Sequence, residues 1–533
     1  MVPLNNRQLT QPARQGVSLD NSHWFQDKEV RRLWPILRAI ESTSMKIQQL
    51  LSHHNLSENP FSQEDAKEDR IFRQGCVDHT FHPSWDKIVG DPESPSSAVV
   101  FGEKGSGKTA LRIQMVEHFK KFNATHPDRR VLILEYDDFN PFLDQFALKE
   151  ANLARWELRD HMDAILSLGT RKLVSMILHE PNEISRQQIA ALDRLQKRDL
   201  LMLAAMYDRS HETTLTDRWF KLRRALRFGW PLGGLYAKKP FLFGLLATAA
   251  FGAAAWYFNW TAGLFGKWWW LGVLFLIAVW LPTLKQWIWA HFLAWNIESS
   301  IRTLNHAIPD LRRLLLWFRR RDIEGQPITQ LEASDARYVL LNKLQAALRT
   351  LGFCSMIVIV DRVDEPYRVG GNAATMHQLM RSIFDLKFLQ HSDLGIKLLL
   401  PGDLWPLIHS EQQDFRDRAR LDKQHYIPSL EWTGQSLEDL VNDRLRACSA
   451  NGQPGPTLRT LMADEITDLE ITHYLEQMKI PRHVFKFFYQ LLSTHCNNYT
   501  ESKPEWKISR ETFMMTWAAF RQSLQRYERG LLA

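Results

Sequence analysis

Cysteine is scarce in this chain of 533 residues, which contains only Cys76, Cys354, Cys448 and Cys496. No two of them are close enough in the sequence to form the CxxC pair of a zinc site or a dithiol motif. A disulfide framework is not indicated either, and isolated thiols are typical of a reducing, cytosolic environment. Residues 1–16 are polar and contain no apolar core, so we expect no cleaved signal peptide.

Charged residues are absent from two long stretches. Neither Pro240 to Gly266 nor Trp268 to Leu284 contains Lys, Arg, His, Asp or Glu. A helix needs about 20 apolar residues to cross about 30 Å of hydrocarbon. We therefore predict a transmembrane hairpin with helices at about 240–260 and 268–290, for which the alternative is a pair of buried helices in a large soluble core. The lack of ionisable residues argues against an ion pathway and disfavours a transporter.

Basic residues flank this apolar segment. Seven lysines and arginines, and no acidic residue, lie between Arg218 and Lys239, and six arginines follow between Arg302 and Arg321. The positive-inside rule predicts a multi-pass protein of the inner (plasma) membrane with both termini in the cytoplasm. The net charge of +7 therefore indicates an anionic lipid bilayer more than nucleic acid, which stays an alternative partner.

A glycine-rich motif follows the short apolar run 97–101. It reads GEKGSGKT and matches GxxxxGK[ST]. Glycines let such a loop curl so that its N–H groups face phosphate oxygens, and the following helix adds its N-terminal dipole. We predict ATP binding, with Lys108 reaching the β- and γ-phosphates and Thr109 ligating Mg²⁺. The predicted nucleotide-binding residues are Gly102, Glu103, Lys104, Gly105, Ser106, Gly107, Lys108, Thr109 and Ala110.

A second apolar run, 356–360, ends in acidic residues. Ligand sites of α/β proteins form at the carboxyl ends of such strands. Asp361 is predicted to hold Mg²⁺, and Asp364 or Glu365 to polarise the attacking water as the catalytic acid–base group. The alternative is an acidic turn at the end of a strand.

Two more apolar runs, 130–134 and 396–400, are predicted to extend the same sheet, and Asp403 after the second is a candidate for a position beside the γ-phosphate. A proline at a helix start precedes Arg482, which we predict to reach the nucleotide from a helical lid. The alternative for Arg482 is a solvent-exposed side chain. Three arginines within 416–420 are candidate arginine fingers or a solvated charge run.

The acidic cluster at Asp361 follows Thr109 by 252 positions, whereas a βαβ unit takes about 30 residues. An insertion must therefore interrupt the domain. The predicted fold is α/β, a P-loop NTPase parallel sheet with a helical C-terminal lid and an inserted two-helix transmembrane hairpin with a helical stalk. The predicted segments are 1–70, a polar and amphipathic arm; 71–150, the first part of the ATPase domain with Walker A; 151–350, the helical insertion; 351–430, the second part with Walker B; and 431–533, the lid.

This arrangement resembles the KAP family of P-loop NTPases, in which transmembrane helices are inserted between the Walker A and Walker B motifs. GEKGSGKT at Gly102 and IVIVDRVDE at Ile357 bracket the hairpin in that manner. The second motif is also similar to that of STAND-type and AAA-like ATPases, although Arg362 replaces the small or acidic residue usual at its place. The segment that ends in Arg482 looks like the lid sensor of the AAA-like relatives.

The resemblance implies a membrane-anchored ATPase that couples ATP binding and hydrolysis to a conformational or oligomeric switch. It would act as a homo-oligomer or with a partner protein. Some family members are implicated in excluding phages, so the resemblance extends to bacterial antiviral defence. The alternatives are a nucleic-acid-associated ATPase, acting as a motor or sensor, and a nucleotide-binding membrane scaffold with little turnover.

Overall fold

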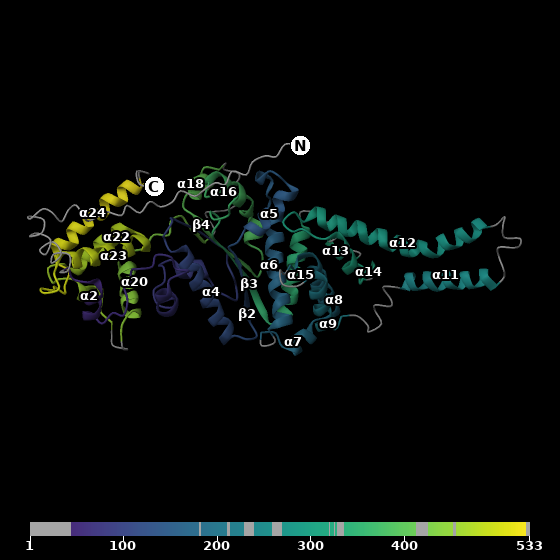
Figure 1. The fold of residues 1–533 in the computed structure, drawn as a ribbon, viewed down its shortest axis with the longest axis horizontal. Coiled ribbons are helices and arrows are strands. Elements are labelled where there is room, and N and C mark those ends of the chain that lie inside the picture. Colours follow the sequence, from purple (N-terminus) through teal and green to yellow (C-terminus); the bar gives the residue numbers. More distant parts are fainter. Residues whose placement is uncertain are drawn as a thin grey trace, which may run out of the picture. The chain divides into compact units, whose positions relative to one another are not determined.

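The computed structural model describes most of the chain (Figure 1). The described residues are 44–180, 183–209, 214–228, 239–257, 269–318, 320–323, 326–327, 335–411, 425–450 and 455–528. They form two compact units, and each is described by itself. Unit 1 contains the described residues of 1–62, 444–471 and 485–533, and unit 2 contains those of 63–443 and 472–484.

Unit 2 is built on a five-stranded parallel sheet in the order β2-β3-β4-β1-β5. The strands are β1 (Ala98–Gly102), β2 (Arg130–Tyr136), β3 (Phe353–Val360), β4 (Leu394–Pro401) and β5 (His425–Ile427). The first four are the apolar runs that the sequence predicted, so the α/β class is confirmed. Because β4 pairs with both β1 and β3, the carboxyl ends of these three strands lie next to one another.

Helices cover both faces of the sheet, which explains why its strands are apolar on both sides. One face packs against α6 (Leu158–His179) and α15 (Ala336–Thr350), and α8 (Arg194–Tyr207) packs on these two helices. The other face packs against α4 (Lys108–Thr125). α6 has 14 buried residues, so this part of the segment that the sequence predicted as a stalk contributes to the layer covering the sheet.

Shorter helices complete unit 2. They are α3 (Trp85–Val89), α5 (Asn140–Lys149), α7 (Arg186–Ala191), α9 (Leu215–Ala225), α13 (Ile308–Leu315), α14 (Arg320–Ile323), α16 (Ala373–Met380), α17 (Leu386–Leu389) and α18 (Leu404–His409). A π-helical turn (Phe72–Cys76) and two 3₁₀ turns (Leu153–Arg155 and Arg381–Ile383) lie between them. Unit 1 contains α2 (Ile47–His53), α21 (Leu458–Leu461) and α24 (Arg510–Glu528). The boundaries between the units fall inside α20 (Gly434–Ala447), α22 (Asp468–Met478) and α23 (Pro481–Asn498).

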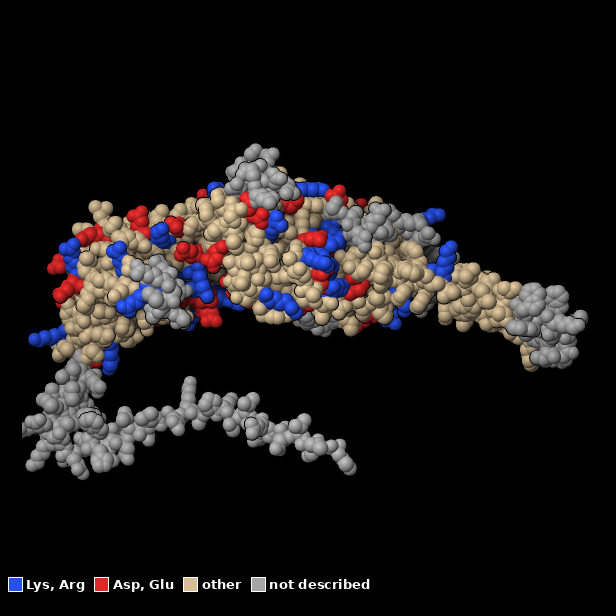
Figure 2. Space-filling model, turned by 90° about the horizontal axis from the view of Figure 1, so that it is seen from above, with Lys and Arg blue, Asp and Glu red and all other residues tan. Residues whose placement is uncertain are grey.

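Two apolar helices of unit 2, α11 (Lys239–Tyr257) and α12 (Trp269–Ser300), lie side by side (Figure 1). The indole Nε1 of Trp280 donates a hydrogen bond to Thr248 Oγ1 at 3.0 Å. Of the 24 exposed large hydrophobic side chains among the described residues, 16 belong to these two helices. Figure 2 shows the same end of unit 2 as a mostly uncharged surface. Such a large apolar surface indicates contact with something other than water.

Among the described helices, one is long and apolar enough to cross a membrane, at Leu271–Ser300 in α12. The apolar part of α11, Phe241–Ala254, is shorter. The helices start and end near the predicted 240–260 and 268–290, except that α12 continues to Ser300. The predicted hairpin tip lies outside the described residues, and the two-span topology stays a prediction.

Candidate functional site

The glycine-rich loop, which we define as residues 102–109, connects the end of β1 to the start of α4. Gly105 and Gly107 have φ angles of +98° and +100°, a left-handed conformation that glycine adopts without strain. The Leu111 N–H donates to the Gly107 carbonyl at 2.8 Å, so the helix follows the loop directly. The sequence-predicted strand–loop–helix arrangement is therefore present.

Lys108 lies at the centre of the charged groups that the sequence singled out. Its Nζ donates to the carbonyl oxygens of Gly102 at 2.7 Å and Glu103 at 3.0 Å. Burial lowers the pKa of Lys108, and nearby carboxylates oppose this effect while a guanidinium adds to it. The carboxylates are those of Asp361, Asp364 and Asp403, and the guanidinium is that of Arg482. The structure thus brings these four predicted residues within electrostatic reach of Lys108.

Asp361 is 2% exposed at the end of β3, and burial raises its pKa. The guanidinium of Arg112, on the second turn of α4, opposes this rise and lies 3.4 Å from Asp361 Oδ2. Arg112 also pairs with Asp137 and, at 3.5 Å, with Glu135 at the end of β2. It therefore balances a cluster of three carboxylates. The sequence analysis did not identify Arg112, although its position three residues after Thr109, one turn along the helix, was a usable signal.

The segment after β3, which we call the acidic loop (361–371), contains two candidate catalytic residues in different environments. Asp364 is half-buried, and its carbonyl accepts a hydrogen bond from the Gly371 N–H at 3.1 Å. The Glu365 side chain is 57% exposed, and its Oε1 lies 3.4 Å from Arg362 Nε. Asp364 is therefore the one that interacts with Lys108, while Glu365 is paired with Arg362.

Arg482 lies against the glycine-rich loop at the start of α23. Its backbone N–H donates to the Gly105 carbonyl at 3.3 Å, and its Nε is 3.6 Å from Glu64 Oε2. A Cβ placed on Gly105 would come within 2.6 Å of the Arg482 Cβ. The side chain is 28% exposed. Arg482 therefore lies next to the glycine-rich loop, and its role at a bound nucleotide stays a prediction.

Trp432 is a contact of the glycine-rich loop that the sequence analysis missed. Its indole Nε1 donates to the Ser106 carbonyl at 2.9 Å, and its own N–H donates to the Lys479 carbonyl at 2.9 Å. The ring is 9% exposed and meets the His82 ring edge-on. Trp432 therefore joins the loop to the segment that carries Arg482. No local pattern could identify it, because the two bonded residues are 326 positions apart.

The residues around Lys108 could bind a magnesium ion with only two protein ligands, Thr109 and Asp361. Among the described residues, no group of three or more His, Cys, Asp or Glu could hold a metal. Mg²⁺ bound with a nucleotide needs only one or two protein ligands because phosphates and waters complete its shell. Asp361 Oδ2 is buried and accepts no hydrogen bond in the described part of the chain, although it forms the ion pair with Arg112 Nε at 3.4 Å. Together with Thr109, which follows Lys108 in the first turn of α4, it provides the oxygen chemistry that Mg²⁺ prefers.

The other residues predicted for the site are more exposed to solvent. Glu103, Lys104 and Asp403 are exposed, and Ala110 is half-buried. The Gly402 N–H donates to the Gly102 carbonyl at 2.9 Å, which sets the residue before Asp403 beside the loop. The candidate arginine fingers within 416–420 lie outside the described residues.

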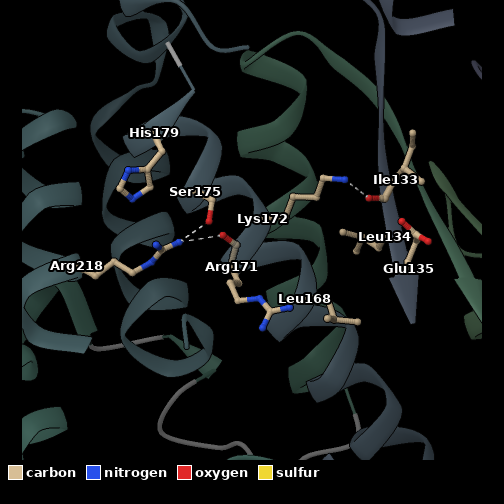
Figure 3. A pocket seen from close by; sticks show the side chains of 9 residues that line it. All are labelled: Ile133, Leu134, Glu135, Leu168, Arg171, Lys172, Ser175, His179 and Arg218. Atoms are coloured by element: carbon tan, nitrogen blue, oxygen red, sulfur yellow. Dashed lines mark hydrogen bonds between the residues drawn. The ribbon is translucent and has the colours of Figure 1, made fainter. Parts of the chain in front are cut away.

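A cavity of about 410 Å³ lies elsewhere in unit 2, between the edge strand β2 and helices α6 and α9 (Figure 3). Its lysine and one of its arginines are already engaged. Lys172 Nζ donates to the Ile133 carbonyl at 2.7 Å, and Arg218 Nε to Asp208 at 2.7 Å. The lysine satisfies a carbonyl on the edge strand, which protects that edge from pairing.

No family model, no curated protein and no solved structure matches this chain. The resemblance to the KAP family accordingly stays an expectation from the sequence motifs.

Proposed function

We propose that the protein is a membrane-anchored P-loop ATPase that faces the cytoplasm and converts ATP binding and hydrolysis into a conformational switch. The observation that carries this proposal is the clustering around Lys108. A curled glycine-rich loop opens a helix, and the charges of Asp361, Asp364, Asp403 and Arg482 converge on its lysine. These groups come from β3, β4 and the start of α23, which are far apart in the sequence.

In this proposal, the loop N–H groups and the dipole of α4 bind the triphosphate, and Lys108 leaves its two carbonyl partners to contact the β- and γ-phosphates. Thr109 and Asp361 would hold Mg²⁺, and the ion would supply positive charge against the phosphates in the transition state. Asp364 accepts a hydrogen bond from the attacking water and orients it, because it is the loop acid that interacts with Lys108. Arg482 contributes positive charge from the lid.

The membrane part of the proposal depends on α11 and α12. Residues 271–289 of α12 rise about 28 Å at 1.5 Å per residue, which matches the hydrocarbon core of a bilayer. Arg312 lies over the Trp287 ring at 4.7 Å, a basic and aromatic pair of the kind found at a membrane boundary. We propose that both helices cross the membrane and that the packing of Trp280 on Thr248 holds them together.

Steady-state ATP hydrolysis by the full chain in lipid nanodiscs tests the catalytic part. Lys108→Ala should reduce turnover by at least 100-fold, because it removes a contact made to the transferred phosphate. Lys120→Ala is the matched control, since this lysine is on the same helix with its side chain 61% exposed. Equal turnover of Lys108→Ala and wild type would refute the assignment. Asp364→Asn compared with Glu365→Gln separates the two acids, and only the first should abolish turnover.

Extraction of cell membranes at high pH tests the anchor. The wild type should remain in the pellet. Leu274→Arg, which puts a charge on an exposed position of α12, should shift protein to the supernatant, because a charge near the bilayer centre costs at least about 2.5 kcal/mol. Wild-type protein in the supernatant without detergent would refute the anchored arrangement.

A further inference from the structure

Helix α12 is one helix with two environments along its length, and Pro282 removes one donor from the backbone hydrogen bonds of its exposed part. From Leu271 to Trp289, most of its apolar side chains are exposed. From Ala290 onward, one side of the helix enters the core of unit 2, where Ala290, Ala294 and Ile297 are fully buried. A single helix therefore connects the apolar surface to the layer that covers the sheet. A shift at its buried end would move the exposed end as well.

One cation, the Lys149 ammonium group, contacts the buried end of α12. Lys149 Nζ donates to the carbonyls of Glu298 at 2.6 Å, Ile301 at 2.8 Å and Leu304 at 3.0 Å, and it pairs with the Glu298 carboxylate at 2.7 Å. These carbonyls belong to the last turn of α12 and the residues just after it. The last carbonyls of a helix have no partner within the helix and carry the negative end of its dipole. Lys149 is therefore an anchor for the end of α12.

Lys149 is also the last residue of α5, and earlier residues of α5 hold the acidic loop. The Tyr367 N–H donates to Asn140 Oδ1 at 3.3 Å. Asp144 accepts hydrogen bonds from the Tyr367 hydroxyl and, at 3.1 Å, from Arg368 Nε. The Arg368 and Asp144 side chains are 41% and 42% exposed, so water competes for this contact. One short helix thus contacts the acidic loop through Asp144 and the end of α12 through Lys149.

We propose that α5 couples the nucleotide site to α12. Asp144 is a positioning residue that senses the acidic loop, and Lys149 transmits a displacement of α5 to the end of the spanning helix. This inference rests on the proposed function, because the displacement would start when a bound nucleotide changes the contacts of Asp361 and Asp364 in the acidic loop. Small shear movements of packed helices are a known way to carry such changes. Here the element that moves is α5, which contacts both the acidic loop and the end of α12.

Hydrogen exchange of the full chain in nanodiscs, with and without a non-hydrolysable ATP analogue, tests the coupling. In the wild type, the analogue should slow exchange in 102–110 and change exchange by about fivefold or more in both 361–371 and 296–304, in keeping with typical coupling factors. Lys149→Met should keep the changes in the first two segments and lose the change in 296–304. Lys149→Arg should restore it. Lys172→Met is the matched control, because that lysine also donates to a carbonyl but does not touch α12.

Asp144→Asn provides a second route if Lys149→Met fails to fold. It weakens an exposed contact only, so it should melt close to the wild-type temperature and still lose most of the change in 296–304. Persistence of that change in folded Lys149→Met or in Asp144→Asn would overturn the coupling. A wild type that responds in 102–110 and 361–371 but not in 296–304 would also overturn it while leaving the proposed function intact. No response in 102–110 would refute the proposed function and the coupling together.

Discussion

Replacement of Trp432 by phenylalanine removes one hydrogen bond from the back of the glycine-rich loop and keeps an aromatic ring in the same place. The lost bond joins the indole Nε1 to the Ser106 carbonyl at 2.9 Å in a site where the tryptophan is 9% exposed. A buried neutral hydrogen bond contributes about 0.5–1.5 kcal/mol net. If this energy holds the loop in its phosphate-binding curl, the fraction of binding-competent protein falls, and ATP binding weakens by about 2- to 12-fold.

Calorimetric titration with an ATP analogue and steady-state hydrolysis measure this effect. KM should rise by the same factor, and kcat should stay within about twofold, because the residues proposed to contact the phosphates are unchanged. Trp156→Phe is the matched control: Trp156 is 3% exposed, and its Nε1 has no hydrogen-bond partner among the described residues. Unchanged affinity in Trp432→Phe would refute the positioning role. Equal weakening in both variants would indicate a general loss of stability instead.

Three further predictions concern buried or strained positions. Lys397 is fully buried, and burial lowers its pKa from 10.5 to about 7. Between pH 7 and 10 the unfolded chain therefore binds more protons than the folded one, so the free energy of unfolding of the wild type should rise by about 1.4 kcal/mol per pH unit. Thermal melts at pH 7, 8 and 9 should show this slope in the wild type and not in Lys397→Met. Arg337→Met leaves the carboxylate of Asp163, 3.1 Å from Arg337, buried without its cation. This should lower the free energy of unfolding by about 3–5 kcal/mol, and a loss below about 1 kcal/mol would contradict the argument. Gly105→Ala places a methyl group 2.6 Å from the Cβ of Arg482 at a φ of +98°. The affinity for ATP, measured by titration, should fall at least about tenfold. Unchanged binding would show that the start of α23 does not constrain the glycine-rich loop.

The sheet could be predicted because four of its strands are continuous apolar runs buried on both faces. The fifth strand, His425–Ile427, has three residues and only one that is buried, so it leaves no apolar run to detect. The pairing order could not be predicted either. β4 follows β3 in the sequence, yet it lies between β3 and β1, and this depends on how the helical layers pack rather than on any one strand.

The site divides in the same way between local motifs and distant contacts. Lys108 and Asp361 were identified because the glycine spacing and the strand-end carboxylate are local patterns. Trp432 and Lys149 were not, because their partners are far away in the sequence. The buried end of α12 did leave a signal: Ala290, Ala294 and Ile297 recur at helical spacing on one face. Their small or branched side chains suit contact with protein as well as with lipid, so composition alone could not separate the two environments.

The contacts along α5 differ in a way that sets where movement can start. The Asp144 contact with the acidic loop is exposed to water, and ion pairs of this kind contribute little net stability. The Lys149 and Glu298 side chains are only 23% and 17% exposed, and Lys149 donates to three carbonyls, so breaking this contact would leave partly buried polar groups without this partner. When α5 is displaced, the weaker of these two contacts, that of Asp144, breaks first. The acidic loop can therefore change its grip on α5 at small energetic cost, while α5 and the end of α12 move together. This asymmetry suits the switch proposed above, since the contact that releases easily is with the acidic loop and the better-protected one is with the end of α12.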